Sequence, residues 1–224
     1  NQILLTGLEK HEGKSDLSVD WQVTNLSSDE GWDEAMAGCD YVLHVASPIT
    51  MQLPKDEDEM VKPAVEGTLR VLKAASKAGV KRVVITSSVA AIMYGTDKQG
   101  IFNEEDWTDP KSKTTNVYAK SKTLAEQAAW DFMEHDTSGM ELSTVLPAMV
   151  FGPILEEDFG VSVGAILDMM NGKYPIVPNW DMGVVDVRDV ASLELLAMTK
   201  PEAAGKRFVC SAENMFMKDQ NEYL

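Results

Sequence analysis

The stretch KPAVEGTLRVLKAASKAGVKRVVITSS, residues 62–88, predicts a helix that is followed at once by a buried strand. Val65, Leu69 and Leu72 recur at helical spacing, and Gly79 stands where a helix is expected to end. The run RVVITS at 82–87 is apolar almost throughout, which is typical of a strand covered on both faces. A helix that leads directly into such a strand is half of the repeating unit of a parallel α/β sheet.

Outward from this unit, apolar β-branched runs alternate with helical patterns along the whole chain. The sequence predicts strands at 2–6, 19–24, 41–46, 82–87, 141–146 and 207–211, and helices at 28–37, 57–78, 116–134, 163–171 and 187–198. This alternation indicates the α/β class, with a doubly wound parallel sheet that has helices on both faces.

The segment between the first two expected strands, residues 7–17, breaks the pattern. Its eleven residues are nearly all polar, so they cannot supply the crossover helix that a parallel pair needs. Gly7 also stands where a dinucleotide fold keeps its Gly-x-Gly-x-x-Gly fingerprint, which this sequence lacks. Either the protein has no first crossover, or residues between Gly7 and Leu8 are left out of the sequence. We favour the second reading, because a missing helix would leave one sheet face bare.

Composition excludes several classes of partner. Lys plus Arg number 20 against 36 Asp plus Glu, and the resulting net charge of −16 opposes nucleic acid binding. Cys39 and Cys210 have no Cys-x-x-Cys spacing, and the three histidines have no ligand spacing, so we expect neither metal nor disulfides. No apolar run is long enough to cross a membrane, and no leader precedes the first expected strand, although one could precede Asn1. We expect a soluble cytoplasmic protein with no membrane partner.

Tyr118 and Lys122 lie at positions i and i+4 of an expected helix, so the phenol and the ammonium can share one face. A nearby cation lowers a tyrosine pKa from its usual value near 10 and makes the phenol a credible acid or base. The spacing alone is no better than coincidence, and the pair could simply open an amphipathic helix. Thr86, Ser87 and Ser88 end a strand upstream, where ligands of α/β sheets bind, although such residues also commonly begin a turn.

A strand-end serine followed 30 residues later by Tyr-x-x-x-Lys resembles the extended short-chain dehydrogenase/reductase superfamily. Further segments resemble the dihydroflavonol 4-reductases and their relatives, the cinnamoyl-CoA reductases and the microbial aldehyde and ketone reductases. These segments are HVASP (44–48), KDEDEMVKPAVEGTLRVLKAA (55–75), RVVITSS (82–88), YAKSKTLAEQAAW (118–130), LPAMVFGP (146–153) and VVDVRDVA (184–191).

The resemblance implies a role for each matching residue. Ser88, rather than Ser87, would polarise a carbonyl, Tyr118 would protonate its oxygen, and Lys122 would bind the nicotinamide ribose and hold the tyrosine pKa down. The implied cofactor-binding residues are Gly7, Asn25, Leu26, Val45, Ala46, Ser47, Tyr118, Lys122, Pro147 and Val150.

Two positions depart from the family pattern. Asn25 and Leu26 stand where relatives usually have Asp-Leu, and asparagine can still hydrogen-bond an adenine amine. Met93 stands where dihydroflavonol reductases place an asparagine, so flavonoid specificity is not expected. The expected substrate pocket comprises Ser88, Met93 and Met149.

The resemblance implies an NADP(H)-dependent oxidoreductase that reduces a small-molecule aldehyde or ketone to an alcohol, with NAD as an alternative cofactor. Residues 1–150 would form the dinucleotide-binding domain. Residues 151–224 would form most of a smaller, incomplete substrate lobe, with 184–211 returning partly to the main sheet. Two alternatives stay open, a nucleotide-sugar epimerase or dehydratase and a non-catalytic nucleotide-sensing module. The sequence makes no prediction about oligomeric state.

Overall fold

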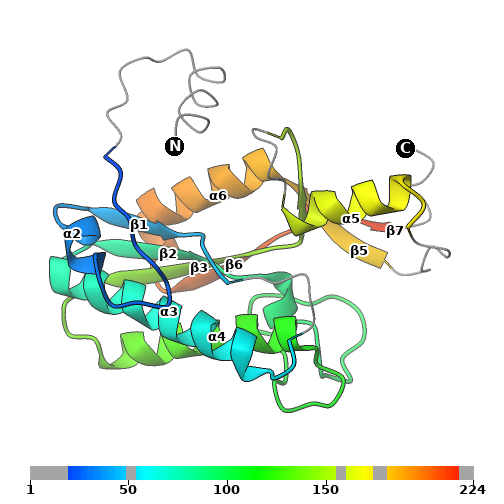
Figure 1. Cartoon of the computed structure of the whole chain (residues 1–224), viewed down its shortest axis with the longest axis horizontal. Helices are drawn as coiled ribbons and strands as arrows, with labels where there is room; N and C mark the ends of the chain where they lie inside the picture. The colour runs from blue at the N-terminus through cyan, green and yellow to red at the C-terminus, as the bar shows by residue number, and fades with distance from the viewer. Residues whose placement is uncertain (1–19, 49–53, 155–159, 174–180, 217–224) are drawn as a thin grey trace.

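The computed structural model describes residues 20–48, 54–154, 160–173 and 181–216 (Figure 1). Its main sheet has four strands in the order β1-β2-β3-β6, and every neighbouring pair is parallel. The strands are β1 (Tyr41–His44), β2 (Arg82–Thr86), β3 (Glu141–Pro147) and β6 (Lys206–Cys210). The register pairs His44 with Ile85 and Ile85 with Thr144, so the carboxyl ends of β1, β2 and β3 meet at one edge of the sheet.

Helices cover both faces of this sheet. The helices α3 (Asp58–Ala78) and α4 (Val117–His135) lie on one face, and α6 (Val187–Thr199) lies on the other (Figure 1). Alternate residues of β2 enter the two cores, because successive side chains of a strand point to opposite faces. Val83 and Ile85 pack with Leu72 of α3, whereas Val84 packs with Val190 of α6. The predicted doubly wound α/β sheet is confirmed.

The helix α3 buries a face slightly rotated from the one that its sequence pattern predicts. The buried side chains are Met60, Ala64, Thr68, Val71, Leu72, Ala74 and Ala75, while Val61, Val65 and Leu69 are only half-buried along its flank. Gly79 ends the helix with a left-handed φ of 74°, as its place in the sequence predicts. Gly67 allows a close approach, because a Cβ there would lie 3.0 Å from Leu26 Cβ.

A second sheet has the order β4-β5-β7. It consists of β4 (Met149–Phe151), β5 (Asp181–Asp186) and β7 (Glu213–Phe216), and β5 pairs in parallel with β4 but antiparallel with β7. The sequence did not predict these three strands. The helix α5 (Val161–Met170) packs beside β4, and β6 returns the chain to the main sheet next to β3.

The expected strand at 19–24 is wrong for the residues that the structure describes. Residues 20–24 pair with no strand of the described chain, and Trp21 and Val23 are 42% and 94% exposed. Alternating apolar residues make a strand only where a neighbouring strand pairs with them. The expected helix at 28–37 is reduced to α2 (Trp32–Met36), because Gly31 before it has a φ of 80°. The expected strand at 2–6 and Gly7 lie outside the described residues.

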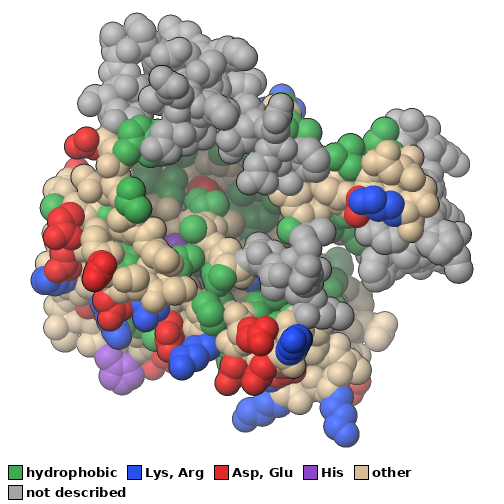
Figure 2. Space-filling model, viewed as in Figure 1, with side chains coloured by type: hydrophobic (Ala, Val, Ile, Leu, Met, Phe, Trp, Pro, Cys, Tyr) green, Lys and Arg blue, Asp and Glu red, His purple; other side chains and the backbone are tan. Residues whose placement is uncertain are grey.

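Figure 2 shows hydrophobic side chains over the middle of one face, above a rim of acidic and basic side chains. Exposed apolar residues of the described chain include Tyr41, Leu43 and Val45, on and just after the edge strand β1. Within the described residues, no helix combines the length and apolar character needed to cross a membrane.

Candidate active site

Two consecutive serines follow β2 and make different contacts. Ser88 is the N-cap of the short 3-10 helix η1 (Val89–Ala91), and its Oγ accepts a hydrogen bond from the Ala90 amide at 3.1 Å. Its own hydroxyl proton is therefore available to a second partner. Ser87 instead donates to Glu126 Oε2 at 2.6 Å, inside the protein. The two hydroxyls therefore have different partners. That of Ser88 acts on the Tyr118 phenol, whereas that of Ser87 binds Glu126.

Tyr118 lies in the first turn of α4, directly after a well-formed helix start. Asn116 caps this helix, with its Oδ1 accepting from the Ala119 amide at 2.8 Å. The Ser88 hydroxyl is near enough to the Tyr118 phenol to act on its pKa. Burial raises the pKa of Tyr118 above its usual value, the Ser88 hydrogen bond opposes this rise, and Tyr94 adds to it. The phenol is therefore protonated throughout the neutral pH range.

Lys122 lies one helical turn after Tyr118 and is only 7% exposed. Its Nζ donates to the backbone carbonyl of Thr86 at 3.3 Å. Burial lowers the pKa of Lys122 to about 8, and the carboxylate of Glu126 opposes this shift. The sequence predicted that Lys122 would lower the pKa of Tyr118, but that pKa is raised. Burial is the larger effect, and Ser88 is the group that opposes it.

The donors around Lys122 fit a ribose. Thr86 is the one hydrogen-bond partner of its ammonium among the described residues, so two of the three N–H donors are left for hydroxyls of a ligand. Val45, Ala46 and Ser47 follow β1 at the same sheet edge, and Val45 is 56% exposed. A ligand could therefore lie across the ends of β1 and β2 and still reach Lys122.

The remaining predicted cofactor residues lie at different depths. Pro147 ends β3 and is buried, and Val150 in β4 packs against the core cluster that contains Val84 and Val185. Pro147 is in register with Cys210 of β6. Among the described residues, neither Pro147 nor Val150 forms a side-chain hydrogen bond with Ser88, Tyr118 or Lys122.

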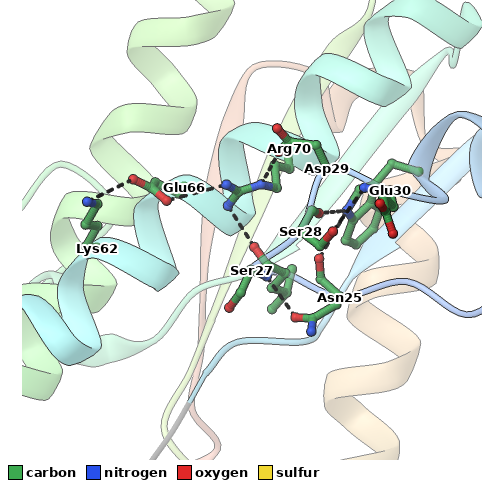
Figure 3. Close-up of polar contacts among 10 residues, drawn as sticks. Asn25, Ser27, Ser28, Asp29, Glu30, Lys62, Glu66 and Arg70 are labelled. Carbon is green, nitrogen blue, oxygen red and sulfur yellow. Dashed lines mark hydrogen bonds and ion pairs between the residues drawn. The ribbon is translucent and has the colours of Figure 1, made fainter.

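Asn25 and Leu26 form part of a separate polar cluster that fastens residues 25–29 to α3 (Figure 3). The Oδ1 of Asn25 accepts from the Ser27 amide at 2.8 Å, and the Leu26 carbonyl accepts from Arg70 NH1 at 2.8 Å. Arg70 also pairs with Asp29. The groove beside this cluster is lined by residues of α2, α3 and the Asp29 turn, and none of these residues belongs to the Ser88, Tyr118 and Lys122 group.

Of the two methionines predicted to line a substrate pocket, Met93 has the clearer access. It lies two residues after the end of η1, and 41% of it is exposed. Met149 is half-buried in β4, where it pairs in register with Val184 of β5. Among the described residues, Met149 forms no hydrogen bond with Ser88.

Sequence reasoning missed two buried polar residues of the site. His44 ends β1 at 8% exposure, and its Nε2 lies 3.5 Å from Thr68 Oγ1. Burial, and then the charge of Lys122, lower the pKa of His44 to about 4, so the ring is neutral near pH 7. Glu126 is 1% exposed and lies four residues after Lys122. Its signal in the sequence is a carboxylate among small helix residues, Ala125, Ala128 and Ala129, on the Tyr118 helix. No cluster of the described residues could hold a metal ion.

Comparisons with known proteins give a consistent relationship. The sequence pattern of the 3-beta hydroxysteroid dehydrogenase/isomerase family matches residues 7–222. Cinnamoyl-CoA reductase 1 of Petunia hybrida is 39% identical over 195 residues, which cover 85% of this chain and 56% of that protein. An anthocyanidin reductase of Vitis vinifera is 33% identical over 216 residues, covering 89% of this chain and 63% of that protein.

Among solved structures, yeast methylglyoxal/isovaleraldehyde reductase Gre2 in complex with NADPH superposes with a TM-score of 0.81. It is 31% identical, and the match covers 98% of this chain and 71% of that chain. The present chain therefore spans a little over half the length of the first two curated relatives, 56% and 57%.

Proposed function

The chain belongs to the 3-beta hydroxysteroid dehydrogenase/isomerase family, and from that premise we propose that it is an NADPH-dependent reductase of aldehydes or ketones. The observation that carries the proposal is that the Ser88 hydroxyl acts on the Tyr118 phenol, with Lys122 one turn away and buried. These three side chains gather at the carboxyl ends of parallel strands, where ligands of open α/β sheets bind.

In the proposed reaction each residue has one task. The Ser88 hydroxyl and the Tyr118 phenol bind the carbonyl oxygen and polarise it, and the phenol then gives its proton to that oxygen. The raised pKa of Tyr118 supports this direction, because a donor must hold its proton before it can give it. Lys122 binds ribose hydroxyls with the two donors that Thr86 leaves unused. The reduced nicotinamide, when bound, supplies the hydride to the carbonyl carbon and leaves oxidised.

We propose NADPH rather than NADH as the preferred reductant. The support comes from relatives, since the yeast and Candida albicans Gre2 structures are described as NADPH complexes. Asn25 and Leu26 would contact the adenine, and Val45, Ala46, Ser47, Pro147 and Val150 would line the cofactor. Gly7, which the resemblance assigns to cofactor binding, lies outside the described residues. We also propose that the protein works in a reducing compartment, because Cys39 and Cys210 form no disulfide.

For the substrate we propose a small carbonyl compound of limited polarity. Met93 lies five residues after Ser88 with 41% of it exposed, and its flexible thioether suits an adaptable apolar wall. Met149 is a weaker candidate for the same wall, because it lies half-buried in the second sheet.

The decisive experiment follows NADPH oxidation at 340 nm by the purified chain with a panel of aliphatic and aromatic aldehydes and ketones. UDP-sugars serve as the contrasting substrates, with product analysis for epimers or dehydration. Carbonyl-dependent NADPH oxidation supports the proposal. Turnover of UDP-sugars without net oxidation of the cofactor would replace it with the epimerase alternative, and tight cofactor binding with no turnover would favour a sensing module.

A further inference from the structure

Glu126 is the most completely buried charged side chain near the proposed site, and its hydrogen bonds go to residues other than Ser88. It lies four residues after Lys122 and eight after Tyr118, so the three side chains share one face of α4. A carboxylate that is 1% exposed costs free energy unless its oxygens are fully partnered. Its partners therefore indicate which structural role the carboxylate has.

Both oxygens of Glu126 are occupied, and the donors come from two strands, from the residue that follows a third strand, and from its own helix. Oε2 accepts from Ser87 Oγ at 2.6 Å. Oε1 accepts from Thr144 Oγ1 at 2.8 Å, from Arg207 Nε at 2.8 Å and from Trp130 Nε1 at 3.4 Å. Ser87 follows β2, Thr144 lies in β3 and Arg207 lies in β6. One side chain thus fastens α4 across the sheet.

The partner Arg207 is itself held in place. Its guanidinium lies 3.7 Å over the ring of Trp107, and its NH1 donates to the carbonyls of Glu104 at 2.6 Å and Asp106 at 2.8 Å. It is 9% exposed at its side chain, so the ion pair with Glu126 is withdrawn from solvent. An ion pair with both partners fixed defines a geometry more strictly than a flexible surface pair does.

We propose that Glu126 is a positioning residue of the reductase: by binding Ser87 and the strands behind it, it sets where Tyr118 and Lys122 stand relative to Ser88. This inference rests on the proposed function. Ser87 is the covalent neighbour of Ser88 and of Thr86, whose carbonyl accepts from Lys122. A shift of α4 along the sheet would therefore disturb the hydroxyl contact and the ammonium contact together.

The charge of Glu126 makes its role measurable through the pKa of Lys122, which packing alone would not report. Three groups face Lys122: Glu126 from α4, His44 from β1 and the Thr86 carbonyl from β2. Tyr118 lies one helical turn earlier, and Arg207 lies on the far side of Glu126. His44 is neutral near pH 7, and Tyr118 keeps its proton. Glu126 is the group whose charge raises the pKa of Lys122 against burial, so its removal lowers that pKa further.

The test compares the wild-type chain with Glu126→Gln, Glu126→Asp and Ser87→Ala. Glu126→Gln keeps the side-chain length but loses the charge, and we expect the Lys122 pKa, measured by NMR of the 13Cε-labelled apo protein, to fall by about one unit. The alkaline limb of the carbonyl-reduction rate moves to lower pH with it. Glu126→Asp keeps the charge but withdraws the carboxylate, so kcat falls about tenfold while the Lys122 pKa stays near the wild-type value.

Ser87→Ala breaks the link to the strand end without leaving a buried charge unpaired. We expect kcat to fall about fivefold, with cofactor affinity within about twofold and the Lys122 pKa unchanged. Glu141→Gln is the matched control, because it removes the carboxylate of the Arg82 ion pair at the opposite ends of β2 and β3. It should leave both kcat and the Lys122 pKa as they are.

The outcomes separate this inference from the proposed function. A wild-type chain without carbonyl reduction contradicts the proposed function, and the Lys122 pKa of apo Glu126→Gln still tests the charge of Glu126. With an active wild type, unchanged kcat and pH profile in the Glu126 variants overturn the inference. If Glu126→Gln does not fold, Ser87→Ala is the deciding variant. An unchanged kcat in Ser87→Ala would overturn the inference, because it would show that Glu126 does not position the site residues through Ser87.

Discussion

Lys122 Nζ lies 3.3 Å from the backbone carbonyl of Thr86, two residues before Ser88. The contact joins the start of α4 to the end of β2, which are far apart in the sequence but close together in the fold (Figure 1). Burial raises the pKa of Tyr118, and the Ser88 hydroxyl opposes this rise. The geometry suits a phenol that donates a proton and a lysine that binds a ribose.

The two strand-end serines should differ in their effect on turnover. Ser88→Ala removes the hydroxyl that contacts Tyr118 and should lower kcat by about 100-fold, as the loss of one oxyanion donor does. The loss in Ser87→Ala should be at least about tenfold smaller, because that hydroxyl contacts Glu126 instead. Steady-state rates with one aldehyde at saturating NADPH make the comparison. Equal losses in the two variants would contradict the assignment of Ser88.

The reduction rate should fall as the pH rises through about 8. Burial lowers the pKa of Lys122 to about 8, so the ammonium that we propose binds the ribose loses its proton above that pH. Initial rates between pH 6 and 10 at subsaturating cofactor would show this limb. Lys122→Met should bind cofactor at least about tenfold more weakly near pH 7 and lose the limb, because it has no proton to release. A rate that stays flat to pH 10 would refute the role of Lys122.

His44 should make the protein less stable in acid. Its pKa is about 4 when folded and 6.5 when exposed, so the unfolded chain binds a proton that the folded chain does not between these values. The free energy of unfolding therefore falls as the pH drops from 6.5 to 4, by up to about 3 kcal/mol from this residue alone. His44→Gln should show a shallower fall than wild type in urea titrations over that range. Parallel curves would show that His44 is not the group responsible.

Arg82→Met should weaken the packing of α6 on the sheet. The buried guanidinium donates to the carbonyls of Ala197 at 2.7 Å and Lys200 at 2.6 Å, where α6 ends, and pairs with Glu141. Its loss leaves these acceptors without a partner and should lower the free energy of unfolding by about 3 kcal/mol. Thermal and urea denaturation would measure the change. A variant as stable as wild type would mean that water replaces the guanidinium without cost.

The sequence predicted the main sheet well, because its strands appear in the sequence as distinct apolar runs. RVVIT and YVLH are apolar runs that end at polar residues, and Gly79 separates the helix from the strand that follows. The second sheet carries no such signal. Its strand β4 has three residues and β5 contains Gly183, so these strands form through pairing that local composition does not encode. The wrong strand at 19–24 has the opposite cause, since its alternating pattern finds no partner in the described chain.

For the site, Ser88, Tyr118 and Lys122 could be named from family resemblance and order along the chain. Their spacing could not give the direction of the Tyr118 pKa, because that depends on how much solvent the fold removes. Glu126 was missed for a related reason. A glutamate on a helix is usually solvated, and only the fold shows that α4 turns this one toward Ser87, Thr144 and Arg207.

Tyr118→Phe is the most direct test of whether Tyr118 donates the proton, because it removes one oxygen and keeps the ring. The measurement is single-turnover NADPH oxidation with a saturating aldehyde, together with the cofactor dissociation constant from fluorescence quenching. We expect a rate at least about 100-fold below wild type, with cofactor affinity within about threefold. A variant that reduces the aldehyde at close to the wild-type rate would show that the proton comes from a group other than Tyr118.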